Sequence, residues 1–404
     1  MAVDAVVSIA SDLRPKLDSN DSVTGDTVLA RYRMLAEVCH SDNESARILK
    51  RSDIYQGGAN IVYKLDSLGS DDEKYAPLRN RVLRVRKSVD DTTTQQIANC
   101  FSGFISKLLE PRFLVEIKLV HLTEDFIASL NLDLHQLELS GWRSTKHVGA
   151  RVKPDAWGLL LTDMTSDGTL RKEGGGAYAI EFKPKWLSQS PNAPPFSRRC
   201  RTCAIRAQRD SEKQSQGHSD RPAVAGAAKA TFCPLALLSD DRATLATIAR
   251  SLFATTDYAA VDLQDQHQTF FTTRFVDFFT VQGDGLRLLR RLQFLQQRLD
   301  PYGILATGIS PLPEHITLIH LKRFQLAMTL RDCSLLMKIP LSATEPVEAR
   351  LADLDVKSSR RKLEEWRLKE RSLRIGGWYT CREEDGEGTG GEDVCVLKEV
   401  EWWV

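Results

Sequence analysis

The chain has 404 residues, of which 42% are hydrophobic and 27% charged, and its formal net charge at pH 7 is +1. These values are typical of a soluble globular protein with one large domain or two ordinary ones. The near-zero net charge excludes a basic field over the whole molecule, so any basic site must be local. No apolar run approaches the roughly 20 residues that a membrane-spanning helix needs, so we expect no membrane span.

The chain start and the cysteines indicate a reducing compartment. Residues 1–16 lack the basic-then-apolar order of a secretory signal, so we expect an intracellular protein, nuclear or cytoplasmic. The eight cysteines are scattered. Cys200 and Cys203 form a metal-like pair that His218 and Cys233 could complete, but structural zinc usually brings a second close pair, which this sequence lacks. Free thiols are therefore the expectation, with zinc as the alternative.

Hydrophobic periodicity predicts alternating strands and helices in the first part of the chain. A polar extension, residues 1–50, contains an expected helix over 27–38. We then expect a strand, glycine turn and strand over 55–65, a strand over 82–87, an amphipathic helix over 97–109, an extended segment over 113–120, a short helix over 123–130 that Thr123 can cap, and an apolar strand over 157–161.

Two features of this part are typical of a nucleotide site. The Gly57-Gly58 turn permits a phosphate to approach the backbone, although the Gly-Lys-Ser/Thr ending of a Walker A loop is missing. Alternation in the next strand places Arg84 and Arg86 on one face, and a glycine hairpin followed by a cation-bearing strand is how kinase-like lobes hold ATP phosphates. The alternative is an ordinary glycine hairpin.

The apolar strand over 157–161 runs into Thr162-Asp163-Met164-Thr165. A buried strand that breaks into a polar connector is how a kinase hinge begins, with an acid such as Asp163 near the ribose. The alternative is a turn at a strand end, with Asp163 as a cap.

The second part of the chain again mixes helices and strands. We expect strands over 177–182, 270–281 (one or two), 334–339 and 349–354, and helices over 240–255 (capped by Ser239 or Asp240), 284–299, 315–330 and 358–371. Residues 210–227 are polar and are expected to be a mobile segment, and the acidic, glycine-rich stretch over 383–392 is expected to be a loop or disordered.

A cationic stretch follows the expected strand over 177–182. Lys183 and Lys185 flank Pro184, which biases Lys183 toward extended geometry and so places both ammonium groups on one side. Five arginines follow: Arg198, Arg199, Arg201, Arg206 and Arg209. This stretch can form the floor of a site for a ligand with many phosphates. On pattern alone, two solvated lysines and a basic loop are the favoured interpretation.

Four short motifs occur in an order that changes this balance. Glu181-Phe182-Lys183-Pro184-Lys185 resembles the Glu-Ile-Lys-Pro-Lys signature of the inositol-pentakisphosphate 2-kinase family. The other three resemble its glycine-rich nucleotide loop, its Thr-x-(Lys/Arg)-Asp-Cys-Ser segment and its Asp-Leu-x-x-Lys segment; they are Gly57-Gly58-Ala59-Asn60-Ile61-Val62, Thr329-Leu330-Arg331-Asp332-Cys333-Ser334 and Asp353-Leu354-Asp355-Val356-Lys357. Four motifs in order, from Gly57 to about Trp366, identify the chain as a fungal-type member.

The resemblance implies an α/β fold, the two-lobed inositol-polyphosphate kinase fold, with a smaller N-terminal lobe and a larger C-terminal lobe. Its implied parts are an extension at 1–50, an N-lobe with nucleotide loop and hinge at 51–165, a C-lobe with substrate and catalytic residues at 166–380, and a tail at 381–404. ATP would lie in the cleft.

The resemblance also implies roles for individual residues. Asp332 would orient or deprotonate the attacking hydroxyl, Lys183 would assist catalysis and bind substrate, and Asp353 would hold magnesium on ATP. Nucleotide contacts are expected from Gly57, Gly58, Ala59, Asn60, Arg84 and Asp163 as well as Asp353. Substrate-phosphate contacts are expected from Lys183, Lys185, Arg198, Lys357 and Arg361, with Lys118 as a further candidate.

The implied reaction is ATP- and Mg²⁺-dependent phosphorylation of the 2-hydroxyl of inositol 1,3,4,5,6-pentakisphosphate to the hexakisphosphate. Two departures bear on the substrate contacts: residues 253–262 have no obvious match to a plant Asn-Asn-x-Arg segment, and Cys200 falls near a lysine of some relatives. The alternatives are another inositol-polyphosphate kinase and a non-catalytic polyphosphate- or RNA-binding module. His-Arg-Asp and Asp-Phe-Gly segments are absent from the sequence, which argues against a protein kinase. We expect a monomer without a nucleic-acid partner.

Overall fold

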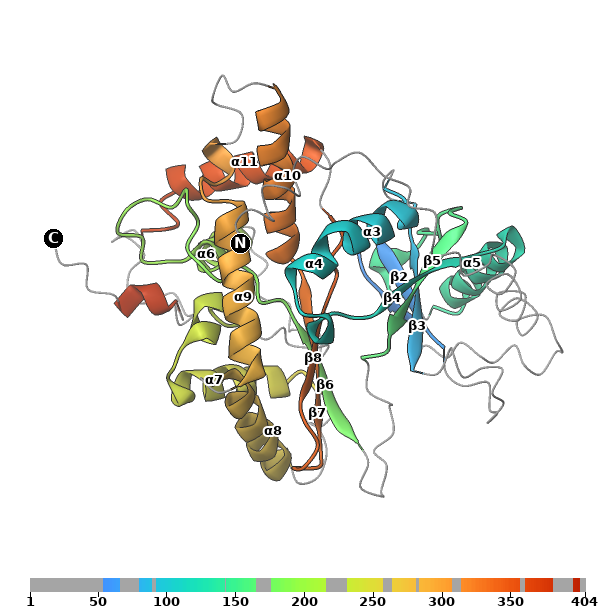
Figure 1. The fold of residues 1–404 in the computed structure, drawn as a ribbon, viewed down its shortest axis with the longest axis horizontal. Helices are drawn as coiled ribbons and strands as arrows, with labels where there is room; N and C mark the ends of the chain where they lie inside the picture. Colours follow the sequence, from blue (N-terminus) through green and yellow to red (C-terminus); the bar gives the residue numbers. More distant parts are fainter. Residues whose placement is uncertain are drawn as a thin grey trace. The chain divides into compact units, whose positions relative to one another are not determined.

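The structure, a computed structural model, describes residues 54–65, 80–88, 92–141, 143–164, 176–215, 231–256, 264–280, 283–306, 314–356, 360–380 and 395–399. The chain forms two compact units, drawn in Figure 1. Unit 1 comprises Met1–Lys107 and Val115–Asp163, and unit 2 comprises Leu108–Leu114 and Met164–Val404. Each unit combines helices with its own antiparallel sheet, so the predicted α/β class is confirmed, while the two-lobed arrangement stays a prediction.

Unit 1 is built on a five-stranded antiparallel sheet with the order β1-β2-β3-β5-β4. Its strands are β1 (Ile54–Gln56), β2 (Asn60–Lys64), β3 (Arg81–Arg86), β4 (Ile117–His121) and β5 (Trp157–Thr162). The predicted strands over 55–65, 82–87 and 157–161 are confirmed by β1 to β3 and β5.

Alternating apolar side chains let both faces of this sheet pack against helices. On one face Ile61, Leu83 and Leu160 join the buried side of α5 (Glu124–Leu139). On the other face Leu159 and Leu161, with neighbouring apolar side chains, pack against α3 (Thr94–Cys100). The central strands are therefore buried on both sides.

The helices of unit 1 follow the predictions with changed lengths. Thr123 caps α5 as predicted, since its side chain accepts a hydrogen bond from the Phe126 N–H (3.2 Å), but the helix extends far beyond residue 130. The predicted helix over 97–109 consists of α3, a π-helical turn η4 (Phe101–Ile105) and α4 (Ser106–Leu108). A short 3-10 turn, η6 (Thr145–His147), precedes β5.

Unit 2 contains a three-stranded antiparallel sheet whose strands are β6 (Ala177–Phe182), β7 (Ser334–Pro340) and β8 (Glu348–Ala352). The central strand β7 pairs Leu335 with Phe182 on one side and Ser334 with Ala352 on the other. The end of β6, the start of β7 and the end of β8 therefore meet at one edge of the sheet.

Helices make up most of the rest of unit 2. They are η5 (Pro111–Phe113), α6 (Arg201–Ser215), η8 (Pro234–Leu238), α7 (Arg242–Phe253), α8 (Gln264–Phe279), α9 (Asp284–Leu299), η10 (Ile304–Ala306), α10 (Glu314–Leu330), α11 (Arg360–Ile375) and η11 (Val396–Glu399). In Figure 1 α7, α8 and α9 lie on one side of the sheet, and contacts between α8 and β7 join that layer to it. The predicted helices over 284–299, 315–330 and 358–371 are confirmed by α9, α10 and α11.

One prediction in this unit is wrong. The segment 270–281, expected to form strands because of its aromatic and β-branched residues, lies mostly in α8. Phe271, Phe275 and Phe279 repeat every four residues, so a helix presents all three on one face, where they are fully buried. Burial of that face outweighs the β-propensity of the individual residues.

Three smaller predictions also change. Residues 210–215, expected in a mobile polar segment, form the last turns of α6. The cap of α7 is Asp241, whose carboxylate accepts hydrogen bonds from the Ala243 and Thr244 N–H groups, instead of Ser239 or Asp240. The predicted helix over 27–38 and the tail over 383–392 lie outside the described residues.

Within the part of the chain that the structure describes, no helix combines the length and the apolar character needed to cross a membrane.

The aromatic face of α8 predicts a stability difference between two phenylalanines. Phe275 is fully buried and its ring lies 4.7 Å from that of Phe279, whereas Phe294 on α9 is 53% exposed. Phe275→Ala should lower the free energy of unfolding by about 3–5 kcal/mol, because it removes buried apolar surface and leaves a cavity. Phe294→Ala should cost well under about 1 kcal/mol. Urea unfolding followed by circular dichroism measures both, and equal losses would contradict this packing.

Candidate active site

Two lysines extend from the end of β6 and converge on one acid in unit 2. Lys183 Nζ donates to the Asp332 backbone carbonyl (2.7 Å) and lies 3.7 Å from its carboxylate. Lys185 Nζ donates to the same carboxylate (2.8 Å). Simple strand alternation does not explain this, because β6 ends at Phe182 and Lys185 has a φ of 59°, in the left-handed region. The predicted convergence of the ammonium groups holds, but the segment from Lys183 to Lys185, called the lysine turn below, changes direction at Lys185 instead of staying extended.

A second acid lies beside the first. Asp353 follows the last residue of β8, and its Oδ2 lies 3.4 Å from Lys183 Nζ and 3.3 Å from Ser334 Oγ. Ser334, the first residue of β7, also donates to Glu181 Oε1 (2.6 Å). Asp353 has a φ of 55°, a conformation that aspartate tolerates better than most residues but that still costs about 1 kcal/mol or more. The sheet register thus brings residues from three separate segments of the sequence into one polar cluster.

The charges of this cluster keep Lys183 protonated. Burial alone would lower the pKa of Lys183, but the negative charges of Asp332 and Asp353 raise it above its ordinary value. The lysine therefore carries a positive charge between two carboxylates throughout the neutral range. The neighbouring Cys333 is different, because full burial raises the pKa of its thiol to about 12 and its Sγ contacts the Leu330 carbonyl. Cys333 is a packed, unreactive thiol.

Gln296 on α9, which sequence reasoning did not single out, fixes the turn after β6. Its fully buried amide accepts from the Leu187 N–H (3.0 Å) and donates to the carbonyls of Lys185 (2.9 Å) and Leu330 (3.2 Å). One side chain therefore ties the lysine turn to the end of α10, two residues before Asp332. No local sequence signal distinguishes it from the other glutamines of α9.

Arg331, next to the first acid, is a structural residue. Its guanidinium is 1% exposed, pairs with Asp300 (2.5 Å) and stacks over the Trp186 ring at 3.6 Å. It also donates to the Gln296 carbonyl (3.2 Å). A buried arginine needs such partners, because an unpaired charge in the interior is costly.

The arginine run does not form a single basic floor. Arg201 is buried and pairs with Glu370 (2.7 Å), and its guanidinium lies over the Trp186 ring, 4.6 Å from the ring centroid. Arg206 donates to the Phe232 carbonyl (2.9 Å). Arg198 is exposed, and both its backbone N–H and that of Arg199 donate to the Tyr379 carbonyl (2.9 Å). Arg201 therefore does not contribute to the basic floor that the sequence allowed, because it is buried and paired with Glu370.

In unit 1 the glycine turn is exposed and open. A Cβ at Gly58 would meet nothing within 4 Å, and one at Gly57 would meet only the Asn60 carbonyl at 3.9 Å. Neither a left-handed backbone nor internal packing therefore requires glycine here, and the space above the backbone suits a phosphate. Lys87, missed by sequence reasoning, donates to the Gly57 carbonyl (2.8 Å) from a nearly fully buried position. Burial, followed by the charges of Arg143 and Lys146, lowers the pKa of Lys87.

Arg84 lies in the central strand β3 and is 5% exposed. With the Asn60 amide oriented so that its oxygen faces the guanidinium, that oxygen accepts hydrogen bonds from Nε (3.2 Å) and Nη2 (2.6 Å) of Arg84. The two residues, both predicted to contact nucleotide, therefore lie together beside the glycine turn. Asp163 follows β5 at the end of unit 1, is 8% exposed, and donates its backbone N–H to the Asn80 carbonyl (2.8 Å).

The other predicted residues are not joined to these clusters by described contacts. Lys118 is exposed on β4 of unit 1, 3.4 Å from Glu116. Arg361 lies in the first turn of α11, where only the backbone is described. Lys357 lies outside the described residues.

Comparison with known proteins shows to which family the chain belongs. The model of the family described as "Inositol-pentakisphosphate 2-kinase" matches residues 54–372. The chain belongs to the inositol-pentakisphosphate 2-kinase family. A protein of Yarrowia lipolytica named inositol-pentakisphosphate 2-kinase is 27% identical over 325 residues, which cover 80% of this chain and 90% of that protein. The resemblance drawn from four short motifs is thereby confirmed, and all four motifs lie inside the matched residues.

In this family member, the hydrogen bonds of Gln296 lead us to expect that its side chain holds the Lys185 backbone in place. Gln296→Met keeps the length of the side chain but removes a hydrogen-bond partner from one N–H and two carbonyls in the interior, at about 1–3 kcal/mol for each group left unpaired. The variant should unfold at lower urea concentration and should loosen the Lys185 turn. Gln297→Met, at an exposed position one residue later, should change neither property. Unfolding midpoints of the two variants test this, and equal midpoints would contradict the role of Gln296.

Proposed function

We propose that this chain transfers the γ-phosphate of ATP to the 2-hydroxyl of inositol 1,3,4,5,6-pentakisphosphate, which gives inositol hexakisphosphate. The observation that carries the proposal is the cluster at the edge of the β6-β7-β8 sheet. Lys183, Lys185, Asp332 and Asp353 come from three separate family motifs; Lys183 lies within ion-pair distance of both acids, and Lys185 pairs with Asp332. Family membership supplies the reaction class.

Asp332 is the group assigned to the acceptor hydroxyl. Its carboxylate is 39% exposed, so a hydroxyl can reach it, and Lys185 at 2.8 Å holds its Oδ1 in position. Its backbone is fixed by the N–H that donates to the Thr329 carbonyl (3.0 Å). A fixed carboxylate can orient the hydroxyl and accept its proton as the new O–P bond forms.

Lys183 is assigned to the transferring phosphoryl group. It is partly buried, stays charged, and has carboxylates on both sides. In that position the ammonium group can stabilise the negative charge that develops while the phosphoryl group passes from ATP to the acceptor hydroxyl. A cation whose electrostatic effect is greatest in the transition state contributes mainly to the rate.

The substrate requires further cations, because each of its phosphates carries about −1.5 to −2 charge at pH 7. Lys185 and Arg198 are accessible on unit 2, and the family motifs add Lys357 and Arg361. Arg198 suits this role because its backbone is anchored on Tyr379 while its side chain has no partner among the described residues. Lys118 is a further proposed contact.

Nucleotide binding is assigned to the glycine turn and its neighbours in unit 1: Gly57, Gly58, Ala59, Asn60, Arg84 and Asp163. The open space above Gly57 and Gly58 and the adjacent Arg84 guanidinium fit a polyphosphate. In unit 2, Asp353 fits a Mg²⁺ ligand, since its carboxylate is 45% exposed and its described contacts use Oδ2. When bound, Mg²⁺ would neutralise phosphate charge.

The direct test is turnover of the purified chain with ATP, Mg²⁺ and inositol 1,3,4,5,6-pentakisphosphate. We expect consumption of ATP and a hexakisphosphate product whose new phosphate is on the 2-position, identified by ³¹P and ¹H NMR. Inositol hexakisphosphate, which has no free hydroxyl, is the matched control and should not be phosphorylated. Phosphorylation at a different hydroxyl would assign another inositol-polyphosphate kinase activity, and binding without turnover would indicate a non-catalytic module.

The proposed roles predict that replacing Asp332 or Lys183 lowers kcat, whereas replacing Lys185 mainly raises KM. Asp332→Asn and Lys183→Ala should lower kcat by on the order of a hundredfold or more, because they remove proton transfer and transition-state charge stabilisation. Lys185→Ala should mainly raise the KM for the inositol phosphate, because it removes a cation that binds a substrate phosphate. Steady-state kinetics with circular dichroism as a folding control measures this. Unchanged kcat in Asp332→Asn would move the catalytic acid elsewhere.

The role proposed for Asp353 as a Mg²⁺ ligand predicts that its replacement lowers turnover. Asp353→Asn should abolish most turnover with little change in fold, because a neutral amide is a poor Mg²⁺ ligand beside a triphosphate. Asp355→Asn, two residues later, is the matched control and should keep most of its activity. Rates measured over a range of Mg²⁺ concentrations decide between them. A near-normal rate of the Asp353 variant at ordinary Mg²⁺ would show that this carboxylate is not the ligand.

A further inference from the structure

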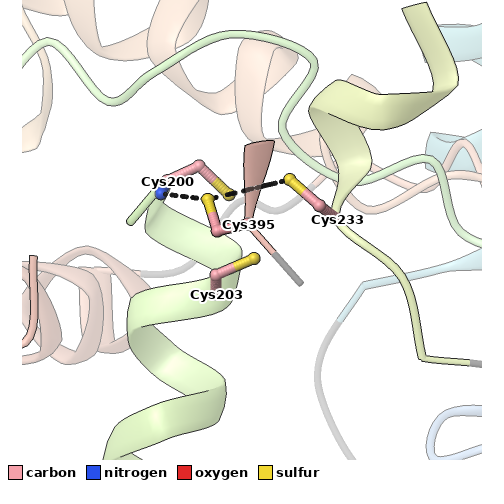
Figure 2. Close-up of side chains that lie close together, drawn as sticks. All are labelled: Cys200, Cys203, Cys233 and Cys395. Atoms are coloured by element: carbon pink, nitrogen blue, oxygen red, sulfur yellow. Dashed lines mark hydrogen bonds between the residues drawn. The ribbon is translucent and has the colours of Figure 1, made fainter. Parts of the chain in front are cut away.

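Outside the edge of the β6-β7-β8 sheet, the described residues form further clusters of polar side chains. In unit 2, four buried cysteines meet with all their sulfur atoms within 4.8 Å of one another, as Figure 2 shows: Cys200, Cys203, Cys233 and Cys395. Cys395 thereby joins the three cysteines that the sequence singled out, whereas His218 lies outside the described residues. In unit 1, basic side chains gather against the glycine turn, Gly57-Gly58.

Lys87, which directly follows β3, binds the glycine turn through its backbone and through its side chain. Its backbone N–H donates to the Ala59 carbonyl (2.9 Å), and its Nζ donates to the Gly57 carbonyl (2.8 Å). The turn itself is closed by the Gly57 N–H, which donates to the Asn60 carbonyl (3.0 Å). Lys87 is 2% exposed while both glycines are exposed, so its Nζ reaches Gly57 from the interior. The direction of the Gly57 carbonyl is therefore fixed by a buried side chain.

The direction of this carbonyl also determines where the next N–H points. The Gly57–Gly58 peptide bond is trans, and in a trans peptide the C=O and the following N–H point in opposite directions. Because the Gly57 carbonyl is directed inward to Lys87, the Gly58 N–H is directed outward, into space where a Cβ at Gly58 would meet nothing within 4 Å. No described residue accepts a hydrogen bond from it. The turn thus presents an oriented backbone donor of the kind that binds anions.

Two further basic side chains keep Lys87 and the turn in place. His147 of η6 lies with its Nδ1 3.2 Å from Lys87 Nζ, and since an ammonium group can only donate, we assign Nδ1 as the acceptor and the ring proton to Nε2. Burial, followed by the charges of Lys87 and Lys146, lowers the pKa of His147, so the ring is neutral at pH 7 and can accept. Arg143 Nη2 donates to the side-chain oxygen of Gln56 (3.1 Å), the residue before the turn.

The charge of Lys87 is buried without a described counter-charge. Arg143 pairs with Glu138, whereas the described contacts of Lys87 Nζ are one carbonyl and one imidazole nitrogen, and no described carboxylate pairs with it. Burial, followed by the charges of Arg143 and Lys146, lowers the pKa of Lys87, as expected for an unfavourable buried cation. Such costs are concentrated at functional sites. A polyphosphate bound on the outer side of the glycine turn would supply the missing negative charge.

We propose that Lys87 is a positioning residue for the nucleotide. It orients the Gly57–Gly58 peptide so that the Gly58 N–H donates to a phosphate oxygen of ATP, and its charge attracts the triphosphate from the inner side of the turn. Lys87 acts through the backbone without touching the nucleotide, because its Nζ is directed to the interior face of Gly57. This role rests on the proposed function, which it deepens by naming one backbone donor and the side chain that orients it.

The first test is titration calorimetry of the full chain with ATP and Mg²⁺, without an inositol phosphate. Lys87→Met, which keeps the length of the side chain, should raise the Kd for ATP by about tenfold, the loss expected when one hydrogen bond to a charged group is no longer positioned. Lys146→Met is the matched control, because this exposed lysine lies near His147 but makes no described contact with the turn, and its Kd should stay within about twofold. In turnover assays Lys87→Met should raise the KM for ATP and leave kcat and the KM for the inositol phosphate unchanged, a division that general destabilisation would not give.

The outcomes separate this role from the proposed function. An unchanged Kd for ATP in Lys87→Met, or an equal loss in Lys146→Met, would overturn the role of Lys87 and leave the proposed function standing. An unaltered chain that does not bind ATP would refute the proposed function and this role together.

A measurement on the unaltered chain covers the case in which Lys87→Met fails to fold. Glycine labelled with ¹⁵N and with ¹³C at the carbonyl gives carbon-coupled amide signals in NMR only for glycines that follow another glycine: Gly58, Gly175, Gly176, Gly377 and Gly391. The Gly58 signal is the one that disappears in Gly58→Ala. ATP with Mg²⁺ should move it downfield, because its N–H gains a charged acceptor, whereas Gly377, whose N–H donates to the Arg374 carbonyl (3.2 Å), should not move. A Gly58 signal that is unmoved at saturating ATP would overturn the proposal.

Discussion

The candidate active-site edge of unit 2 depends on one buried charge. Arg331 is almost completely shielded from water, and its guanidinium is compensated by Asp300, by the face of Trp186 and by the Gln296 carbonyl. Each partner comes from a segment that also carries part of the site or its support: Trp186 follows the lysine turn, and Gln296 holds that turn in place. Because an uncompensated buried charge is so unfavourable, the residues around Arg331 have few alternative arrangements. The position of the next residue, Asp332, follows from this constraint.

The same arrangement explains how a flexible, strongly hydrated group such as lysine becomes a fixed element of a site. Lys183 is held by a backbone carbonyl and two carboxylates, and Lys185 by one carboxylate and a left-handed backbone whose carbonyl Gln296 binds. Charges that are already ordered need no reorganisation when the reaction produces new charge, which is the main source of electrostatic catalysis. The local backbone strain at Lys185 and Asp353 is tolerated because the surrounding hydrogen bonds determine both positions.

The long loop from Lys183 to Cys200 is ordered in the same way, by buried side chains. The segment from Lys183 to Cys200 is anchored at its start by Gln296, near its middle by the pairing of Ser190 with Glu370, and at its end by Tyr379 and the cysteines. Glu370 also receives Arg201 and Tyr379, so a second buried carboxylate organises this region much as Asp300 organises the first. Little of this long loop has regular secondary structure, and its order comes from side chains that are distant in sequence.

What the sequence determined by itself was local. The strand over 177–182, the helix over 284–299, the Thr123 cap and the two acids at the ends of neighbouring elements follow from periodicity, capping chemistry and motif order, which act over a few residues. What only the tertiary structure decided was long-range: α8 is a helix because its phenylalanine face is buried, Arg201 is occupied by Glu370, Gln296 is singled out by three backbone groups, and Cys395 joins three distant cysteines. These outcomes depend on which surfaces meet after the chain has packed. No short stretch of sequence contains that information, because each partner lies tens to hundreds of residues away.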